Sequence, residues 1–312
     1  MPNISNEELI PLIKKGDIRT IARCISAIEN QSPDIEELLL NIKPDYNIPV
    51  TGITGSPGAG KSTLLNQVLE HLSEKNLRIA VLAIDPSSPF NFGALLGDRV
   101  RMHSHSNNPR IFIRSIASRG SLGGLSSRTI ETVDLLRSAP FDHIFVETVG
   151  VGQSEVEIAG LADHTILVTT PESGDDVQLI KAGIMEIASM FVVNKSDLDP
   201  EGKFANQLKK LVFNHDNPDE SPPVISVQAA KNKGLEELIT ILESGRLKPN
   251  LTKKATLLAA KTIRLIQEMQ TRHIDFEAIK SEISTHLKKG EFNLYSFAKK
   301  YVDRSENVRQ KR

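Results

Sequence analysis

The chain has 312 residues, of which 39% are hydrophobic and 25% charged, and its formal net charge is −1. This balance is ordinary for a globular protein and gives no general attraction for nucleic acid. Cys24 is the only cysteine, which excludes an intramolecular disulfide and favours a reducing, cytoplasmic setting. No stretch approaches the roughly 18 apolar residues that span a bilayer. The first residues carry no secretory signal, so no membrane partner is expected.

Residues 1–45 are expected to form a helical extension, because Ile18, Ile21, Ile25 and Ile28 share one helical face. From residue 46 to 246, short apolar runs alternate with amphipathic stretches. The predicted strands are 50–54, 78–85, 110–116, 143–148, 165–170, 190–194 and 223–227. Several are apolar on both faces, as in a parallel sheet that helices cover on both sides. The sequence therefore predicts a doubly wound, mostly parallel α/β sheet.

Residues 247–312 are predicted to be helical, with apolar side chains at spacings of three and four. Amphipathic helices that extend beyond a core need an apolar surface to bury against. We expect this region to form a homodimer, and the alternative is that its helices pack on their own sheet.

The segment G-S-P-G-A-G-K-S follows the first predicted strand and precedes a predicted helix. It matches the phosphate-binding loop G-x-x-x-x-G-K-[ST], whose backbone N–H groups surround a phosphate at a helix N-terminus. Lys61 is expected to reach the β- and γ-phosphates, and the Ser62 hydroxyl to bind Mg²⁺. The residues predicted to bind nucleotide here are Gly55, Ser56, Pro57, Gly58, Ala59, Gly60, Lys61, Ser62 and Thr63. This pattern is typical of the P-loop NTPase core.

The segment N-K-S-D ends the sixth predicted strand and indicates which base is bound. The Asp197 carboxylate can accept hydrogen bonds from the ring N1–H and the exocyclic amine of guanine, an arrangement that adenine does not offer. Asn194 is expected to tie this loop to the phosphate loop, and Lys195 to lie along the base. Gln228, Ala229 and Ala230 are predicted to form a third base-binding loop through backbone N–H groups. The predicted ligands are therefore GTP and GDP.

Three carboxylates are predicted near the carboxyl edge of the sheet. Asp85 and Glu147 end predicted strands, and Asp98 lies in the segment L-L-G-D-R-V-R-M. Each alone could instead be a helix cap or a surface ion pair. Together with Ser62 they suit a Mg²⁺ ion, which prefers oxygen ligands.

Several segments together resemble the MeaB-like G proteins, which are GTPase chaperones of adenosylcobalamin-dependent methylmalonyl-CoA mutase and also carry the label of LAO/AO transport system ATPases or kinases. The segments are G-S-P-G-A-G-K-S, D-P-S-S-P-F, G-A-L-L-G-D-R-V-R-M, S-L-G-G-L, E-T-V-G-V-G-Q-S-E, P-E-S-G-D-D-V-Q-L-I-K-A-G and N-K-S-D. The resemblance covers residues 45–245 closely. It implies that residues 85–102, 147–156 and 171–183 change conformation with the nucleotide, and that Glu147 helps to hold Mg²⁺.

The resemblance also implies a function. The chain would hydrolyse GTP slowly by itself, and its nucleotide state would gate loading or protection of adenosylcobalamin on an acyl-CoA mutase. Lys61, Glu147 and Gln153 are the candidate catalytic residues, although Gln153 could instead be structural or contact a partner. None of Arg99, Arg101, Arg114 and Arg119, near the predicted switches, is identifiable as an activating arginine from sequence.

Two alternatives stay open at this point. Related GTPases insert nickel, and His103 and His105 stand close together in M-H-S-H-S, although no cysteine lies nearby. The chain could also be a nucleotide-gated scaffold with negligible turnover. An ATPase or kinase of amino-acid transport is disfavoured, because N-K-S-D favours guanine.

Overall fold

The computed structural model describes residues 6–85, 108–117, 127–148, 158, 160–172, 188–214, 217–218, 221–244, 251–271, 274–290 and 292–309. The chain divides into two compact units, residues 1–261 and 262–312. The domain boundaries predicted after residues 45 and 246 stay a prediction.

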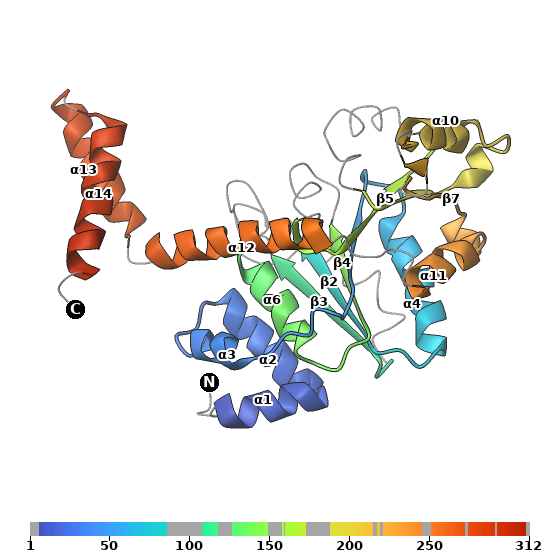
Figure 1. Cartoon of the computed structure of the whole chain (residues 1–312), viewed down its shortest axis with the longest axis horizontal. Coiled ribbons are helices and arrows are strands. Elements are labelled where there is room, and N and C mark those ends of the chain that lie inside the picture. Colours follow the sequence, from blue (N-terminus) through green and yellow to red (C-terminus); the bar gives the residue numbers. More distant parts are fainter. Residues whose placement is uncertain are drawn as a thin grey trace. The chain divides into compact units, whose positions relative to one another are not determined.

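The first unit is built on a seven-stranded sheet in which every neighbouring pair is parallel (Figure 1). Its strands are β1 (Val50–Thr54), β2 (Ile79–Asp85), β3 (Ile111–Ala117), β4 (His143–Thr148), β5 (His164–Thr169), β6 (Met190–Val193) and β7 (Val224–Ser226). Their spatial order is β3-β2-β4-β1-β5-β6-β7. Each strand end lies within one residue of the prediction. The predicted doubly wound parallel sheet is therefore confirmed.

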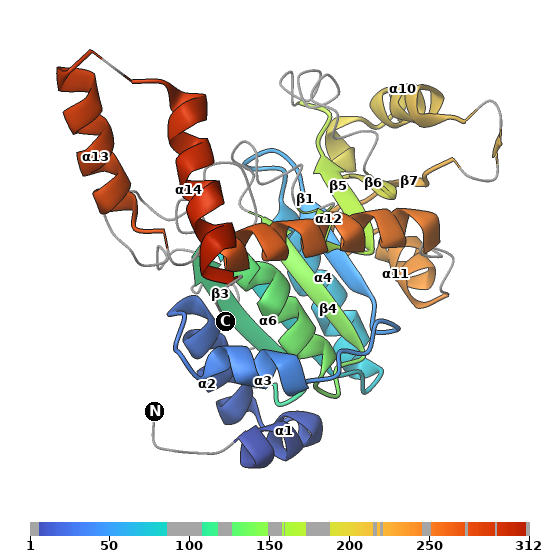
Figure 2. The same ribbon diagram turned by 60° about the vertical axis from the view of Figure 1, so that its left-hand side comes forward.

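Helices cover both faces of this sheet (Figures 1 and 2). Among the described residues, the helices that begin within the first unit are α1 (Asn6–Lys15), α2 (Ile18–Glu29), α3 (Ile35–Asn41), α4 (Lys61–Glu74), α6 (Ser127–Arg137), α10 (Lys203–Val212), α11 (Leu235–Glu243) and α12 (Leu251–Thr271). One core cluster joins α1, α2, α3 and α6 to the sheet, and a second joins α4 and α11 to it. In β2, Ala80 and Leu82 contribute to the first cluster, and Ile79 and Val81 to the second. Burial on both faces explains why the predicted strands are apolar throughout.

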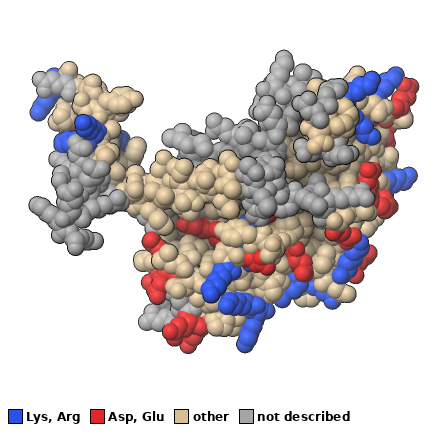
Figure 3. Space-filling model, viewed as in Figure 1, with Lys and Arg blue, Asp and Glu red and all other residues tan. Residues whose placement is uncertain are grey.

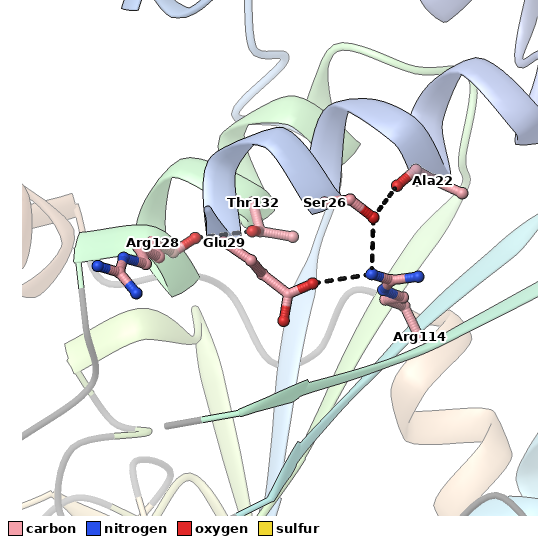
Figure 4. Close-up of polar contacts among 6 residues, drawn as sticks. All are labelled: Ala22, Ser26, Glu29, Arg114, Arg128 and Thr132. Atoms are coloured by element: carbon pink, nitrogen blue, oxygen red, sulfur yellow. Dashed lines mark hydrogen bonds and ion pairs between the residues drawn. The ribbon is translucent and has the colours of Figure 1, made fainter. Parts of the chain in front are cut away.

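Helix α2 is also tied to the edge strand β3 by polar contacts (Figure 4). Arg114 on β3 donates from Nη2 to Ser26 Oγ at 2.9 Å and to Glu29 Oε2 at 2.8 Å. Ser26 Oγ in turn donates to the Ala22 carbonyl at 3.1 Å. Arg114, which the sequence alone could not identify as an activating arginine, thus binds α2.

The second unit contains the end of α12 together with α13 (Phe276–Lys288) and α14 (Leu294–Arg309). Glu282 on α13 accepts hydrogen bonds from Lys300 Nζ at 2.5 Å and from Tyr301 Oη at 2.8 Å, both on α14. The Phe297 ring also lies against the rings of His286 and Tyr301. These contacts hold α13 and α14 together as a helical hairpin. The predicted helical character of this region is confirmed.

In Figure 3, Lys and Arg lie interspersed with Asp and Glu over the lower and right-hand parts of the first unit, in keeping with the net charge of −1. Among the described residues, no helix is long and apolar enough to cross a membrane.

Candidate functional site

The phosphate loop runs from the end of β1 to the start of α4. Gly60 precedes α4 and has a φ of 88°, in the left-handed region that favours glycine. A Cβ at this position would lie 2.3 Å from Asn194 Nδ2, so the position also lacks room for a side chain. The strand–loop–helix context that the motif requires is therefore present.

The Lys61 side chain folds back over the loop. It is 6% exposed, and its Nζ donates to the Gly55 carbonyl at 2.6 Å and to the Ser56 carbonyl at 3.0 Å. The ammonium charge is thus held at the mouth of a loop whose backbone N–H groups favour phosphate.

Ser62 and Glu147 lie side by side, because β1 and β4 are neighbouring strands with Ile53 paired to Glu147. Ser62 Oγ donates to Glu147 Oε1 at 2.6 Å, and Glu147 is 7% exposed. A hydroxyl and a carboxylate oxygen beside a phosphate loop are the oxygen ligands that Mg²⁺ prefers. The residues present therefore fit a Mg²⁺ ion.

Asn194 connects the phosphate loop to the loop after β7. Its Nδ2 donates to the Ala59 carbonyl at 2.9 Å, and its Oδ1 accepts from the Ala229 N–H at 3.0 Å. Asn194 is 3% exposed, so both hydrogen bonds are shielded from water. The tie to the phosphate loop that the sequence predicted is present in the structure.

A cavity of about 330 Å³ lies beside this connection. The residues lining it are Gly60, Thr63, Asn194, Lys195, Asp197, Leu198, Gln228, Ala229, Ala230 and Lys231. They come from the phosphate loop, from the short 3-10 helix η2 (Ser196–Leu198) with the residues before it, and from the 3-10 helix η4 (Ala229–Lys231). Every predicted base-binding residue thus lines one cavity that also reaches the phosphate loop.

The three backbone N–H groups of the third predicted loop are not equivalent. The Gln228 N–H donates to the Lys233 carbonyl at 3.0 Å, and the Ala229 N–H donates to Asn194. The Ala230 N–H is the one of the three without a hydrogen bond in the described part of the chain. It is therefore the group of this loop best placed to donate to a ligand.

Lys231 is a cavity residue that the sequence analysis missed. Its Nζ lies 2.8 Å from Asp197 Oδ2, and this hydrogen bond lowers the pKa of Asp197 below its usual range. The available signal was a lysine directly after Ala229 and Ala230, which places a cation in a loop predicted to face Asp197.

Other predicted residues lie outside the described part of the chain. Asp98 and Gln153 belong to segments that the structure does not describe, and so do His103 and His105. Asp85 ends β2, as predicted, but its side chain is not described. The predicted metal, water-positioning and nickel-binding roles of these residues stay predictions.

The fold and the site define a P-loop nucleotide-binding protein. Residues 21–286 match the sequence model of a family described as methylmalonyl Co-A mutase-associated GTPase MeaB. Because this match spans most of the chain, the chain belongs to the MeaB family, and it is a GTPase. The predicted family resemblance is therefore confirmed.

Relatives match over most of their length. A protein of Pyrococcus abyssi is 44% identical over 293 residues, which are 92% of this chain and 89% of that one. The GTPase ArgK of Escherichia coli is 34% identical over 292 residues, which are 90% of this chain and 85% of that one. The crystal structure of a LAO/AO transport system kinase has a TM-score of 0.66 and covers 97% of this chain and 98% of that one. Its 24% identity shows a shared fold.

Proposed function

We propose that the cavity beside Asn194 binds the guanine of GTP and that the phosphate loop binds its phosphates. The observation that carries this proposal is the pair of hydrogen bonds from Asn194, which fixes the base-binding loops against the phosphate loop. Asp197 would accept from the N1–H and the exocyclic amine of guanine, and the Ala230 N–H would donate to its carbonyl oxygen. Hydrogen bonds to a charged acceptor are stronger than neutral ones, and adenine does not offer this pair of donors, so the site would favour GTP over ATP.

Calorimetry with GTP, GDP and ATP tests this assignment. We expect the guanine nucleotides to bind and ATP to bind at least about 100-fold more weakly. Asp197→Asn should weaken GTP binding by a similar factor, because an amide nitrogen cannot accept from guanine. Asp199→Asn is the matched control, since Asp199 caps the following helix by accepting from Lys203 N and Phe204 N. Equal affinity for ATP and GTP would contradict the proposal.

Hydrolysis would proceed by attack of water on the γ-phosphorus, which breaks its bond to the oxygen bridging the β- and γ-phosphates. The Lys61 ammonium would neutralise charge on the phosphate oxygens. Ser62 and Glu147 would hold Mg²⁺, with Asp85 and Asp98 as further proposed ligands, and the ion would supply charge neutralisation at the phosphates. Gln153 is the proposed water-positioning residue. The slow intrinsic rate is part of this proposal.

We further propose that the nucleotide state gates adenosylcobalamin loading onto, or its protection on, an acyl-CoA mutase. The support is the family description, which names association with methylmalonyl-CoA mutase. A cytoplasmic setting fits Cys24, which is buried and free.

The test measures phosphate release per site with and without the mutase of the same cell. We expect the mutase to accelerate release at least about tenfold, as partners do for other GTPases. Equal rates would contradict the partner proposal. They would leave the assignment of the guanine cavity unaffected.

We also propose that residues 247–312 form a homodimer. In the second unit, Phe276, Leu287, Leu294 and Tyr295 are 73%, 60%, 65% and 89% exposed. Large apolar side chains exposed on a helical hairpin are typical of an interface. Light scattering should give twice the chain mass for the wild type, and Leu287→Glu combined with Leu294→Glu should give one chain mass. A monomeric wild type would contradict the proposal.

A further inference from the structure

Two charged side chains meet inside the cavity proposed to bind guanine. Asp197 follows β6 and Lys231 follows β7, and these strands are parallel neighbours. The two residues are therefore brought together at the same edge of the sheet, with Lys231 Nζ 2.8 Å from Asp197 Oδ2. The Lys231 side chain is 56% exposed and the Asp197 side chain 41%, and both residues line the cavity.

This contact uses an oxygen that the base would also need. Guanine presents two adjacent donors, and a carboxylate that accepts both must direct both of its oxygens at the base. In the structure, one of these oxygens accepts from Lys231. With guanine bound, this oxygen would be shared between the ammonium and the base, and the ammonium would draw the carboxylate away from the base.

We infer that Lys231 competes with the guanine base for Asp197 and thereby accelerates release of bound nucleotide. This inference rests on the proposed function, because it requires guanine at Asp197. The competition is weak, since an ion pair this exposed shifts an equilibrium by at most about fivefold. Two hydrogen bonds from guanine to the same carboxylate outweigh it. Lys231 is thus a residue that tunes how long the nucleotide stays.

The experiment follows release of a fluorescent GDP analogue from the full chain by stopped flow. Lys231→Met removes the ammonium, and we expect release to slow by about two- to fivefold. Lys231→Arg keeps the charge and should release at the wild-type rate. Lys203→Met is the matched control, because Lys203 forms an exposed ion pair with Glu201 at 2.6 Å outside the cavity.

The salt dependence of nucleotide release supplies a second measurement, and a purely structural role of Lys231 would leave it unchanged. Dissolved ions screen exposed ion pairs, and at about 1 M salt the screening length is only about 3 Å. The difference in release rate between the wild type and Lys231→Met should therefore shrink as the salt concentration rises toward about 1 M. An unchanged or faster release from Lys231→Met overturns the inference while the guanine assignment stands. A wild-type chain that binds no guanine nucleotide overturns both.

Discussion

Ser62 Oγ donates a 2.6 Å hydrogen bond to Glu147 Oε1, which joins the first turn of α4 to the end of β4. The two residues are 85 positions apart, and they meet because β1 and β4 are adjacent in the sheet. A cation held by these two side chains would have one ligand from α4 and one from β4. This geometry leads to the first prediction.

Glu147→Gln should lower the apparent affinity for Mg²⁺ in GTP hydrolysis by about 10–100-fold, because the amide is neutral. The measurement is a Mg²⁺ titration of phosphate release. Glu70→Gln is the control, since Glu70 is exposed on the same helix as Ser62. Identical Mg²⁺ curves for wild type and Glu147→Gln would remove Glu147 from the metal site.

Lys61→Met should lower the rate of GTP hydrolysis by about 100–1000-fold, the usual effect of removing one group that stabilises charge in a transition state. The buried ammonium is held by two loop carbonyls, so the thermal melting curve must be recorded as well. Lys75→Met, which removes an exposed ion pair with Glu243, should hydrolyse GTP normally. A Lys61→Met chain that is folded and fully active would disprove the role of Lys61.

Asn194→Ala should lower the free energy of unfolding by about 2 kcal/mol, because the buried Ala59 carbonyl and Ala229 N–H lose their partner. GTP affinity should fall as well, since the base-binding loop is no longer fixed to the phosphate loop. Urea unfolding and calorimetry measure the two effects. Asn41→Ala, at an exposed hydrogen bond to the Glu37 carbonyl, should change stability by less than about 0.5 kcal/mol. Equal losses in both variants would contradict the connecting role.

Much of this architecture could be predicted because its signals are local. The strands of the sheet are short apolar runs, and the phosphate loop and N-K-S-D each occupy a few consecutive residues. The register of parallel strands then places Glu147 and Asn194 at one edge, as the sequence indicated.

Side-chain contacts between elements that are distant in the sequence could not be predicted. The two residues of the Lys231–Asp197 pair are 34 positions apart, and they meet because their loops follow neighbouring parallel strands at the same edge of the sheet. The pairing of Arg114 with Glu29 requires α2 to pack on the edge strand, which no spacing in the sequence specifies. Sequence patterns identify each element, but tertiary packing decides which side chains of different elements meet.

A buried histidine in the sheet leads to the last prediction. His143, at the start of β4, is 7% exposed, stacks on Phe145 and forms a 2.8 Å hydrogen bond between its Nε2 and Thr51 Oγ1. Burial, together with the nearby His164, lowers the pKa of His143 to about 3. In the unfolded chain a histidine titrates near pH ~6.5.

Between these two pKa values the unfolded chain binds a proton that the folded chain does not. The contribution of His143 to stability is therefore present above about pH 6.5 and is lost as the pH falls toward about 3. This group alone should lower the free energy of unfolding by about 2 kcal/mol between pH 7 and pH 5. The glutamine of His143→Gln does not titrate. In urea unfolding, its free energy of unfolding should therefore fall by about 2 kcal/mol less than that of the wild type between about pH 7 and pH 5. Parallel losses in the wild type and in His143→Gln would show that His143 does not stay neutral in the folded protein.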